Sequence, residues 1–376
     1  MTGRSIDGRR RSDDRRHLGG RQHPHDRRLL DRRSFLTASG ALGVVGLTGC
    51  LGDDDGTGDD EAGDDDDAGD GTEADDGEGP TGHAYVTNAG DGTISVIELA
   101  SLTVVDTIDL AKSTSHGIAV DPAGETIYVG EPDEGTIFAV STDEREVEAT
   151  IETGSSAHGV DVSPDGRELY VSGGSVNVRG DVAVVDLDGR EVVDGIETDG
   201  AGHVSFSPDG DLAYVSNVDL NRIAVVDVDS REVLETVSVG EGPNEAVPSP
   251  DGEHVYTANV GDGTVSVVET ADWTETDRIP AGEGTHGIDV SPDGERLWTA
   301  NRDSQDVSVI DLDRGEVVET IDLDASANHL SVAPDGGPIL VTALRSAEVI
   351  ALDPDEPEVR ERIVVGETPH EIAFSS

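Results

Sequence analysis

Cysteine, lysine and aromatic residues are scarce in this chain of 376 residues. Its single cysteine, Cys50, excludes any disulfide framework within one chain. Lys112 is the only lysine, and Lys and Arg together number 25 against 81 Asp and Glu, for a formal net charge of −56. After Cys50 no basic patch is available to neutralise phosphates, so the composition argues against nucleic acid and against anionic membrane surfaces as partners.

The acidic excess is largest from Cys50 onward, where 76 acidic residues stand against 14 basic ones. Hydrated carboxylates keep such a surface soluble in molar salt, where the Debye length is about 3 Å and mutual repulsion is screened. We therefore expect a cell-surface protein of a halophile, and we expect its fold to loosen at low ionic strength.

One segment of about 42 residues recurs seven times along the chain. A unit of this size cannot bury its apolar face alone, so it must stack on its neighbours as an open solenoid or a closed ring. Seven strand-only copies favour the ring, a β-propeller. The copies begin near His83, Glu125, Arg167, Asp211, Glu253, Glu295 and Gly337.

Each copy contains four apolar runs of strand length and no amphipathic helical stretch. A Ser-Pro-Asp-Gly tetrapeptide marks a tight hairpin, because proline fixes φ and glycine supplies φ > 0. The predicted fold class is all-β, a seven-bladed propeller of four-stranded antiparallel blades. In the second copy the runs are Ile127–Val129, Thr136–Val140, Val147–Glu152 and Val160–Val162. Across the chain the tetrapeptide occurs four times, beginning at Ser163, Ser207, Ser249 and Ser291.

All five tyrosines occupy one position of the repeat, which Trp298 takes in the sixth copy. One aromatic per copy at constant phase predicts packing between sheets and not a platform for stacking ligands. The tyrosines are Tyr85, Tyr128, Tyr170, Tyr214 and Tyr256.

The phase of the repeat also predicts how the ring closes. The first copy opens with the second strand of a blade, Ala84–Asn88, whereas the chain ends with His370–Phe374, which matches the innermost strand. We expect the first blade to combine residues 370–376 with residues 83–110, which removes the exposed edges of an open stack.

The run Tyr85-Val86-Thr87-Asn88, followed by GDGTISVIE and later HGIAVDPAG, resembles the YVTN-repeat family of seven-bladed propellers. The resemblance covers residues 83–376 and implies the propeller fold. Similar repeats occur in surface-layer proteins, in lactonase-like propellers and in the propeller domains of some denitrification enzymes. The resemblance therefore leaves the activity open.

Residues 1–49 have the features of an export signal. Eleven arginines lie in residues 1–33, and the apolar run that follows is too short for a transmembrane helix. The residues Arg32, Arg33, Phe35 and Leu36 resemble a twin-arginine signal, which exports folded proteins. A general secretory signal with an incidental arginine pair is the alternative.

Leu47-Thr48-Gly49-Cys50 resembles a lipobox, in which Cys50 is lipidated and becomes the new N-terminus. Residues 50–82 would then form an acidic, disordered tether, since Asp53–Pro80 holds fifteen acidic residues and no basic one. Calcium collection by this segment is less favoured because its carboxylates lack EF-hand spacing. We expect residues 83–376 to form the propeller, extracytoplasmic and lipid-anchored to the outer face of the cell membrane.

Six of the eight histidines after Cys50 fall in the two residues that open each innermost strand. The loops that carry these pairs share one face of a propeller, so the imidazoles should surround one end of the central channel. The histidines are His116, His158, His203, His286, His329 and His370, and Glu245 and Glu371 occupy the same pairs. Asn88, Asn217, Asn259 and Asn301, at the ends of the second strands, should stand close by as ligand-binding candidates.

Three interpretations of this cluster are open. The histidines can be a packing device of the repeat, or they can line a polar funnel for a small molecule, glycan or protein. They can also hold copper, zinc or iron, with Glu245 or Glu371 as carboxylate ligand. The resemblance to a denitrification propeller, whose copper cluster is held by a histidine ring, favours copper. The sequence shows no second electron-transfer domain and no spare cysteine for one, which argues against copper. No cofactor is assigned with certainty.

Other catalytic templates are absent from the sequence, which has no G-x-S-x-G elbow, Walker loop or Cys–His pair. A longer loop in the third copy carries Arg179, a candidate ligand contact. We predict a monomeric binding or scaffold protein at the surface of a halophile. The alternatives are a metal-dependent, copper-type oxidoreductase and a lactonase-type hydrolase that uses Glu245 or Glu371 with a histidine.

Overall fold

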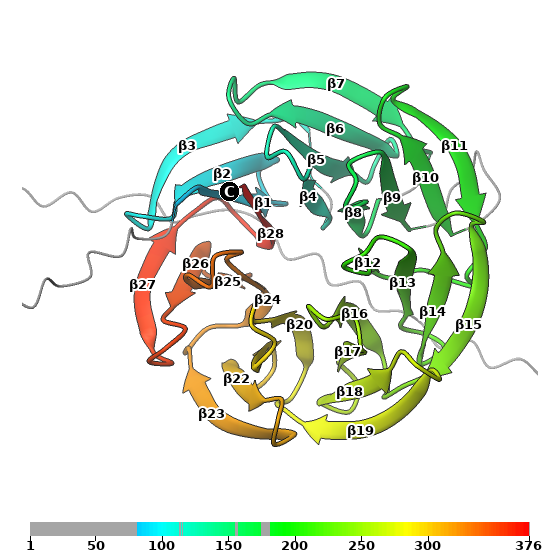
Figure 1. The fold of residues 1–376 in the computed structure, drawn as a ribbon. Helices are drawn as coiled ribbons and strands as arrows, with labels where there is room; N and C mark the ends of the chain where they lie inside the picture. Colours follow the sequence, from blue (N-terminus) through cyan, green and yellow to red (C-terminus); the bar gives the residue numbers. More distant parts are fainter. Residues whose placement is uncertain (1–80, 113, 115, 155–156, 174–180, 376) are drawn as a thin grey trace, which may run out of the picture. The chain divides into compact units, whose positions relative to one another are not determined.

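The computed structural model describes residues 81–112, 114, 116–154, 157–173 and 181–375. In these residues twenty-eight strands form seven four-stranded antiparallel sheets arranged around a central axis (Figure 1). This architecture confirms the all-β, seven-bladed propeller. The predicted signal residues Arg32, Arg33, Phe35 and Leu36, the lipidation site Cys50, the tether up to residue 80 and Arg179 lie outside the described residues.

Every blade presents one strand to the axis and one to the outside (Figure 1). The innermost strands are β28 (Pro369–Ser375), β4 (Ile118–Val120), β8 (Val160–Val162), β12 (Val204–Phe206), β16 (Pro243–Pro248), β20 (Thr285–Val290) and β24 (Ala327–Val332). The second strands are β1 (His83–Asn88), β5 (Thr126–Glu131), β9 (Glu168–Ser172), β13 (Leu212–Asn217), β17 (His254–Asn259), β21 (Arg296–Asn301) and β25 (Ile339–Ala343).

The third strands are β2 (Thr93–Glu98), β6 (Thr136–Ser141), β10 (Val182–Asp186), β14 (Arg222–Asp227), β18 (Thr264–Glu269), β22 (Asp306–Asp311) and β26 (Glu348–Leu352). The outermost strands are β3 (Thr103–Asp109), β7 (Val147–Glu152), β11 (Glu191–Ile196), β15 (Glu232–Ser238), β19 (Thr274–Pro280), β23 (Glu316–Asp322) and β27 (Val359–Val364). Across the residues that the structure describes, we find no helix whose length and hydropathy would permit a membrane crossing.

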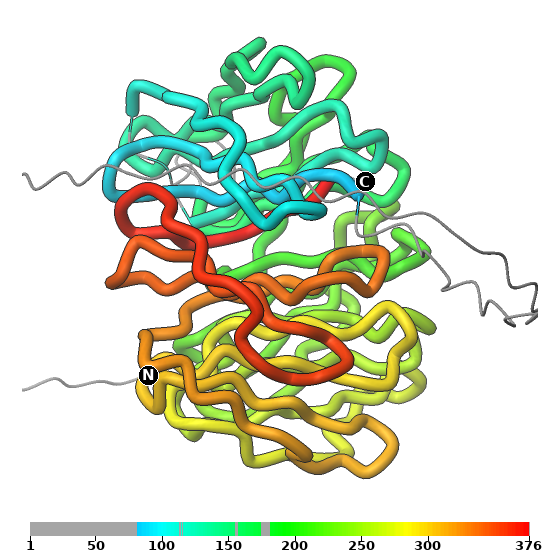
Figure 2. Tube along the Cα trace, turned by 90° about the vertical axis from the view of Figure 1, so that its left-hand side faces the viewer, coloured from blue at the N-terminus to red at the C-terminus, as the bar shows by residue number. Residues whose placement is uncertain are grey.

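The ring closes through the C-terminal strand, as the repeat phase predicts. Strand β28 pairs antiparallel with β1, with Ala84 opposite Phe374 and Val86 opposite Ile372. Figure 2 shows the red C-terminal segment running beside the cyan first blade. The first sheet therefore has the order β28-β1-β2-β3 and contains both ends of the propeller.

The repeated aromatic residue packs between blades. Its exposed fraction is at most 8% in all six copies that carry it, which confirms the predicted core role. Tyr170 of β9, for example, meets Phe206 of the next blade edge-on, with ring centroids 4.7 Å apart. Burying such a side chain stabilises the fold by about 2–3 kcal/mol in each of the six blades that carry it.

The third residue of the YVTN motif ties neighbouring blades together at the channel. Ser216 Oγ accepts the backbone N–H of His203 at 2.9 Å and donates to the carbonyl oxygen of Asn244 in the next blade at 2.6 Å. Thr342 Oγ1 repeats this arrangement with His329 N and His370 O, at 3.1 and 2.7 Å. A hydroxyl at this motif position therefore fixes the backbone of two adjacent innermost strands where they begin.

Candidate functional site

The innermost strands begin with a β-bulge in four blades. In β16, Pro243 is opposite Asn259 and Ala246 is opposite Thr257, so Asn244 and Glu245 together face one residue of β17. Strands β24 and β28 show the same two-against-one register, and β20 shifts between Thr285 and Gly287. Because a bulge re-aims consecutive side chains, both members of an opening pair can project toward the channel mouth.

The two positions of each pair form two layers. The first-position histidines line an open cavity, and the second-position residues form a buried group beneath them. The outer layer consists of His116, His158, His286 and His370. The inner layer consists of His203, Glu245, His329 and Glu371. We call these four residues the inner quartet.

The cavity over the outer layer has a volume of about 360 Å³. His116 and His370 stack in parallel across it, with ring centroids 3.7 Å apart and an interplanar angle of 4°. His116 Nδ1 lies 3.4 Å from His158 Nε2. Arg302, from the loop after β21, lines the same cavity and donates through Nη2 to Asn328 Oδ1 at 2.7 Å. The remaining lining residues are Ala89, Leu344 and Thr368.

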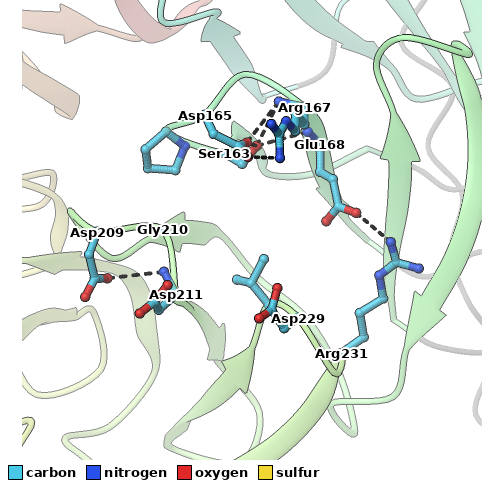
Figure 3. A pocket seen from close by; sticks show the side chains of 11 residues that line it. Ser163, Asp165, Arg167, Glu168, Asp209, Gly210, Asp211, Asp229 and Arg231 are labelled. Atoms are coloured by element: carbon cyan, nitrogen blue, oxygen red, sulfur yellow. Dashed lines mark hydrogen bonds and ion pairs between the residues drawn. The ribbon is translucent and has the colours of Figure 1, made fainter.

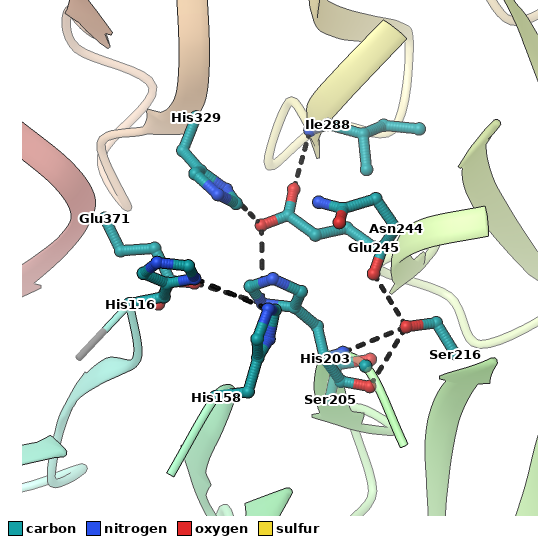
Figure 4. A network of polar contacts seen from close by, with 12 residues as sticks. His116, His158, His203, Ser205, Ser216, Asn244, Glu245, Ile288, His329 and Glu371 are labelled. Atoms are coloured by element: carbon teal, nitrogen blue, oxygen red, sulfur yellow. Dashed lines mark hydrogen bonds and ion pairs between the residues drawn. The ribbon is translucent and has the colours of Figure 1, made fainter. Parts of the chain in front are cut away.

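The inner quartet joins four separate blades (Figure 4). His203 Nδ1 lies 3.0 Å from Glu371 Oε1 and 3.9 Å from Glu245 Oε1. His329 Nδ1 lies 2.6 Å from Glu245 Oε1. The second oxygen of each carboxylate accepts a backbone N–H of the next blade, Ile118 N for Glu371 at 3.1 Å and Ile288 N for Glu245 at 2.9 Å.

Burial dominates the electrostatics of the mouth. It lowers the pKa of His158 to about 3 and holds the pKa of His329 well below its ordinary value, so both imidazoles are neutral at neutral pH. Burial raises the pKa of Glu245 to about 7 and also raises that of Glu371. Burial alone would lower the pKa of His203, but the adjacent Glu371 and Glu245 carboxylates raise it above its ordinary value.

Two further acids line the channel. Asp161 Oδ2 accepts the N–H of Phe206 at 3.0 Å, and Asp289 Oδ2 accepts the N–H of Val332 at 2.8 Å, each from the neighbouring blade. Burial raises the pKa of both carboxyls to about 7. These contacts connect innermost strands and involve no residue of the quartet.

The four predicted asparagines have little surface to offer a ligand. Asn88, Asn217, Asn259 and Asn301 are at most 3% exposed. The amide of Asn259 donates to Thr264 Oγ1 at 3.1 Å and to Ser266 Oγ at 2.9 Å, so it braces the turn within its own blade. A Cβ on Gly240 would lie 2.4 Å from Asn259 Nδ2, so the amide also packs closely on the chain entering the innermost strand.

Arg302 is the residue of the mouth that the sequence reasoning missed. It directly follows Asn301, the last residue of β21. At the same place the other copies carry only apolar or small residues, namely Ala89, Pro132, Gly174, Val218, Val260 and Leu344. A single arginine at this repeat position, in so acidic a chain, is the sequence feature that could have identified Arg302 as a residue of the site.

A second hollow, of about 290 Å³, lies at the far ends of the innermost strands, between neighbouring Ser-Pro-Asp-Gly turns (Figure 3). Its Arg231 is already paired with Glu168 at 2.5 Å and Asp194 at 3.2 Å. Its Arg167 lies 3.5 Å from Asp165. Since both cations of this hollow are engaged, the channel mouth is the stronger candidate site.

Comparisons with known proteins agree with the fold. Residues 125–251 and 246–372 match the family described as YNCE-like beta-propeller. The sequence matches none of the curated proteins. Solved structures that are similar include a functionally unknown protein from Desulfotomaculum acetoxidans, with 18% identity, a TM-score of 0.69 and coverage of 78% of this chain and 99% of that one.

Two functionally named structures are also similar. The periplasmic gluconolactonase of Pseudomonas aeruginosa shares 20% identity, with a TM-score of 0.64 and coverage of 78% of this chain and 99% of that chain. Hydrazine synthase of Kuenenia stuttgartiensis shares 19% identity, with a TM-score of 0.64 and coverage of 72% and 91%. At these identities the likeness extends to the fold alone.

Proposed function

The chain belongs to the YNCE-like β-propeller family, and on this premise we propose that it is an extracytoplasmic binding protein that takes a small anionic ligand at the channel mouth. The observation that carries the proposal is the cavity of about 360 Å³ lined by Arg302 and four imidazoles. Small-molecule sites are pre-formed hollows with a few convergent polar groups, and this cavity has that character.

The charge of the lining favours an anion. Arg302 is the only residue of the lining that stays charged at every physiological pH. One of its N–H groups donates to Asn328, while its buried Nε has no hydrogen-bond partner. An arginine with unused donors, beside imidazoles that can also donate, matches a carboxylate or phosphate group.

The ligand class to test first is a sugar acid or its lactone. One of the similar structures is named a gluconolactonase, whose name specifies a sugar lactone as substrate. A six-carbon sugar acid is of a size that a hollow of about 360 Å³ can enclose. Gluconate is therefore the first probe.

Calorimetric titration of the full chain in molar salt tests this binding. We expect saturable binding of gluconate that weakens about 10-fold or more in Arg302→Leu, because a hydrogen bond to a charged group contributes about 1.5–3 kcal/mol. Leucine stands at the equivalent position of the next copy, Leu344, so the variant should fold. Arg345→Leu removes an exposed arginine outside the lining and should leave affinity within about 2-fold. Equal affinity of Arg302→Leu and wild type would refute the proposed anion site.

Lactone hydrolysis is the second candidate, favoured by neutral imidazoles at an open mouth that can accept a proton from water. Proton release from glucono-1,5-lactone above the spontaneous rate would show it. A rate unchanged by added protein, together with saturable gluconate binding, would leave binding as the function.

The proposal includes a lipid anchor on Cys50 and export through Arg32 and Arg33 in a halophile. Its support is the order of arginine pair, apolar run and lone cysteine, and the acidic excess. Cys50→Ala should move the protein from the membrane fraction to the medium. A variant that stays with the membranes would remove the anchor from the proposal.

A further inference from the structure

The two histidines of the inner quartet each follow a blade whose opening pair ends in glycine. Where a pair has no second-position ligand it carries glycine, at Gly117, Gly159 and Gly287. A Cβ on Gly159 would lie 2.8 Å from the Cα of His203, and one on Gly287 would lie 2.6 Å from the Cα of His329. The backbone of each quartet histidine therefore stands against a glycine of the preceding blade, which lets the two backbones approach closely.

We propose that the inner quartet, His203, Glu245, His329 and Glu371, binds one divalent first-row transition-metal ion beneath the ligand cavity. Each residue can direct one nitrogen or carboxylate oxygen to a common point, since these four atoms all lie within 4.8 Å of one another. Ligands about 2.0–2.2 Å from one ion are separated by roughly 3–4 Å. Two of the measured separations, 3.0 and 3.9 Å, lie in that range, and the third, 2.6 Å, is shorter.

One unsatisfied oxygen of the quartet points to the same conclusion. Glu371 Oε1 is buried and has no hydrogen-bond partner, although it is at ion-pair distance from His203 Nδ1. His329 is only 2% exposed and Glu371 only 9%. A buried polar atom without a hydrogen-bond partner is costly, so a carboxylate oxygen held in this state beside a ring nitrogen has a reason beyond packing.

The surrounding backbone prepares the carboxylates as ligands. Ile118 N–H and Ile288 N–H occupy the outer oxygens of Glu371 and Glu245, which leaves the inner oxygen of each carboxylate directed at the histidines. Hydrogen bonds of this kind from outside a metal centre orient its ligands. The outer-layer histidines are not required for the ion and remain free for the anionic ligand.

The donor set indicates the class of metal. When a metal displaces their protons, the two carboxylates and two imidazoles carry a charge of −2, which a divalent ion neutralises in a buried site. Imidazole nitrogen favours zinc, iron, cobalt or copper(II) over calcium and magnesium, and the lack of sulfur ligands argues against copper(I).

Metal-stripped full-length protein in molar salt provides the test. Titration with Co²⁺ should give a one-to-one complex with visible ligand-field bands, and Zn²⁺ should displace the Co²⁺. Glu371→Gln and Glu245→Gln keep the side-chain shape and should each weaken Co²⁺ binding about 100-fold or more. His254→Gln removes a histidine at the first residue of β17, the end of that strand opposite the opening pair, and should bind as wild type.

Three outcomes would overturn the inference. Folded wild-type protein that binds neither Co²⁺ nor Zn²⁺ stoichiometrically would leave the quartet as an ion-pair network. An affinity loss in His286→Gln as large as that in Glu371→Gln would place the ion in the outer layer. Unchanged Co²⁺ bands in both glutamate variants, with folding confirmed by circular dichroism, would remove the carboxylates from the site. Gluconate is absent from every arm, so the result is independent of the proposed anion binding.

Discussion

The second strands and the openings of the innermost strands lie side by side in every blade, yet the sequence of the former is repeated from blade to blade and that of the latter changes. The second strands repeat an aromatic residue, a small residue or hydroxyl and, in four blades, a buried asparagine. The opening pairs next to them change from His-Gly to Gly-His, Asn-Glu, Asn-His and His-Glu. The uniform second strands hold the seven blades in equivalent positions. Because the opening pairs differ in sequence, their side chains form two chemically distinct layers at these positions.

The largest effect is expected when the pairing of β28 with β1, which closes the ring, is removed. A chain that ends at Pro369 loses most of β28 and leaves the edge of β1 unpaired. Edge exposure and the loss of Ile372 from the core should abolish cooperative unfolding or cause aggregation. Thermal unfolding in molar salt measures this. A melting temperature equal to that of the full chain would show that the ring does not depend on the terminal strand.

The glycines of the opening pairs should be far less tolerant than glycines of the repeated turns. Gly287→Ala places a Cβ within 2.6–2.9 Å of backbone atoms of the next blade and should cost about 3 kcal/mol. Gly336→Ala meets nothing within 4 Å and should cost about 1 kcal/mol, from its positive φ of 76°. Denaturant unfolding of both variants gives the difference. Equal costs would mean that the blades are not in close contact at the mouth.

Asn259 in a second strand and Asn244 in an opening pair should differ in what their loss affects. Asn259→Ala removes three side-chain hydrogen bonds within one blade and should lower the free energy of unfolding by about 2 kcal/mol. Asn244→Ala loses only longer contacts to His286, at 3.2 and 3.3 Å, and should cost less than about 1 kcal/mol. Gluconate affinity should change more in Asn244→Ala, because His286 lines the cavity. The reverse order in both measurements would contradict the assignment of roles.

Much of this division could be predicted from the sequence. The repeat length, the Ser-Pro-Asp-Gly turns and the phase of Tyr85 predicted seven sheets and their closure, because each is a local constraint repeated seven times. The histidines of the opening pairs were also found. Their separation into two layers depends on the β-bulges between the innermost and second strands. The sequence of one strand alone does not specify where such a bulge falls. Arg302 lies on a different loop from the pairs, and only the closed ring brings it to their mouth.

The smallest predicted effect concerns the channel acids. Burial raises the pKa of Asp289 in the folded state to about 7, so the folded chain holds a proton that the unfolded chain releases near its ordinary value of 3.8. This contribution to stability is complete below the unfolded pKa and is lost as the pH rises through about 7. The melting temperature of Asp289→Asn minus that of wild type should therefore increase between pH 5 and pH 8.

Asp293→Asn is the matched control for this difference. Asp293 lies in an exposed turn, where the hydroxyl of Ser291 lowers its pKa, so its contribution is lost only at acidic pH. The melting temperature of Asp293→Asn minus that of wild type should stay constant between pH 5 and pH 8. Parallel curves for Asp289→Asn and Asp293→Asn would show that the channel does not shift the pKa of Asp289.

The most direct measurement of the two-layer account is an anomalous-difference map from crystals loaded with Co²⁺. We expect one peak, about 2 Å from a nitrogen or oxygen of His203, Glu245, His329 and Glu371, with the imidazoles of His116, His158, His286 and His370 outside the coordination sphere. A peak coordinated by the outer imidazoles, or no peak at the mouth in a fully loaded crystal, would contradict it.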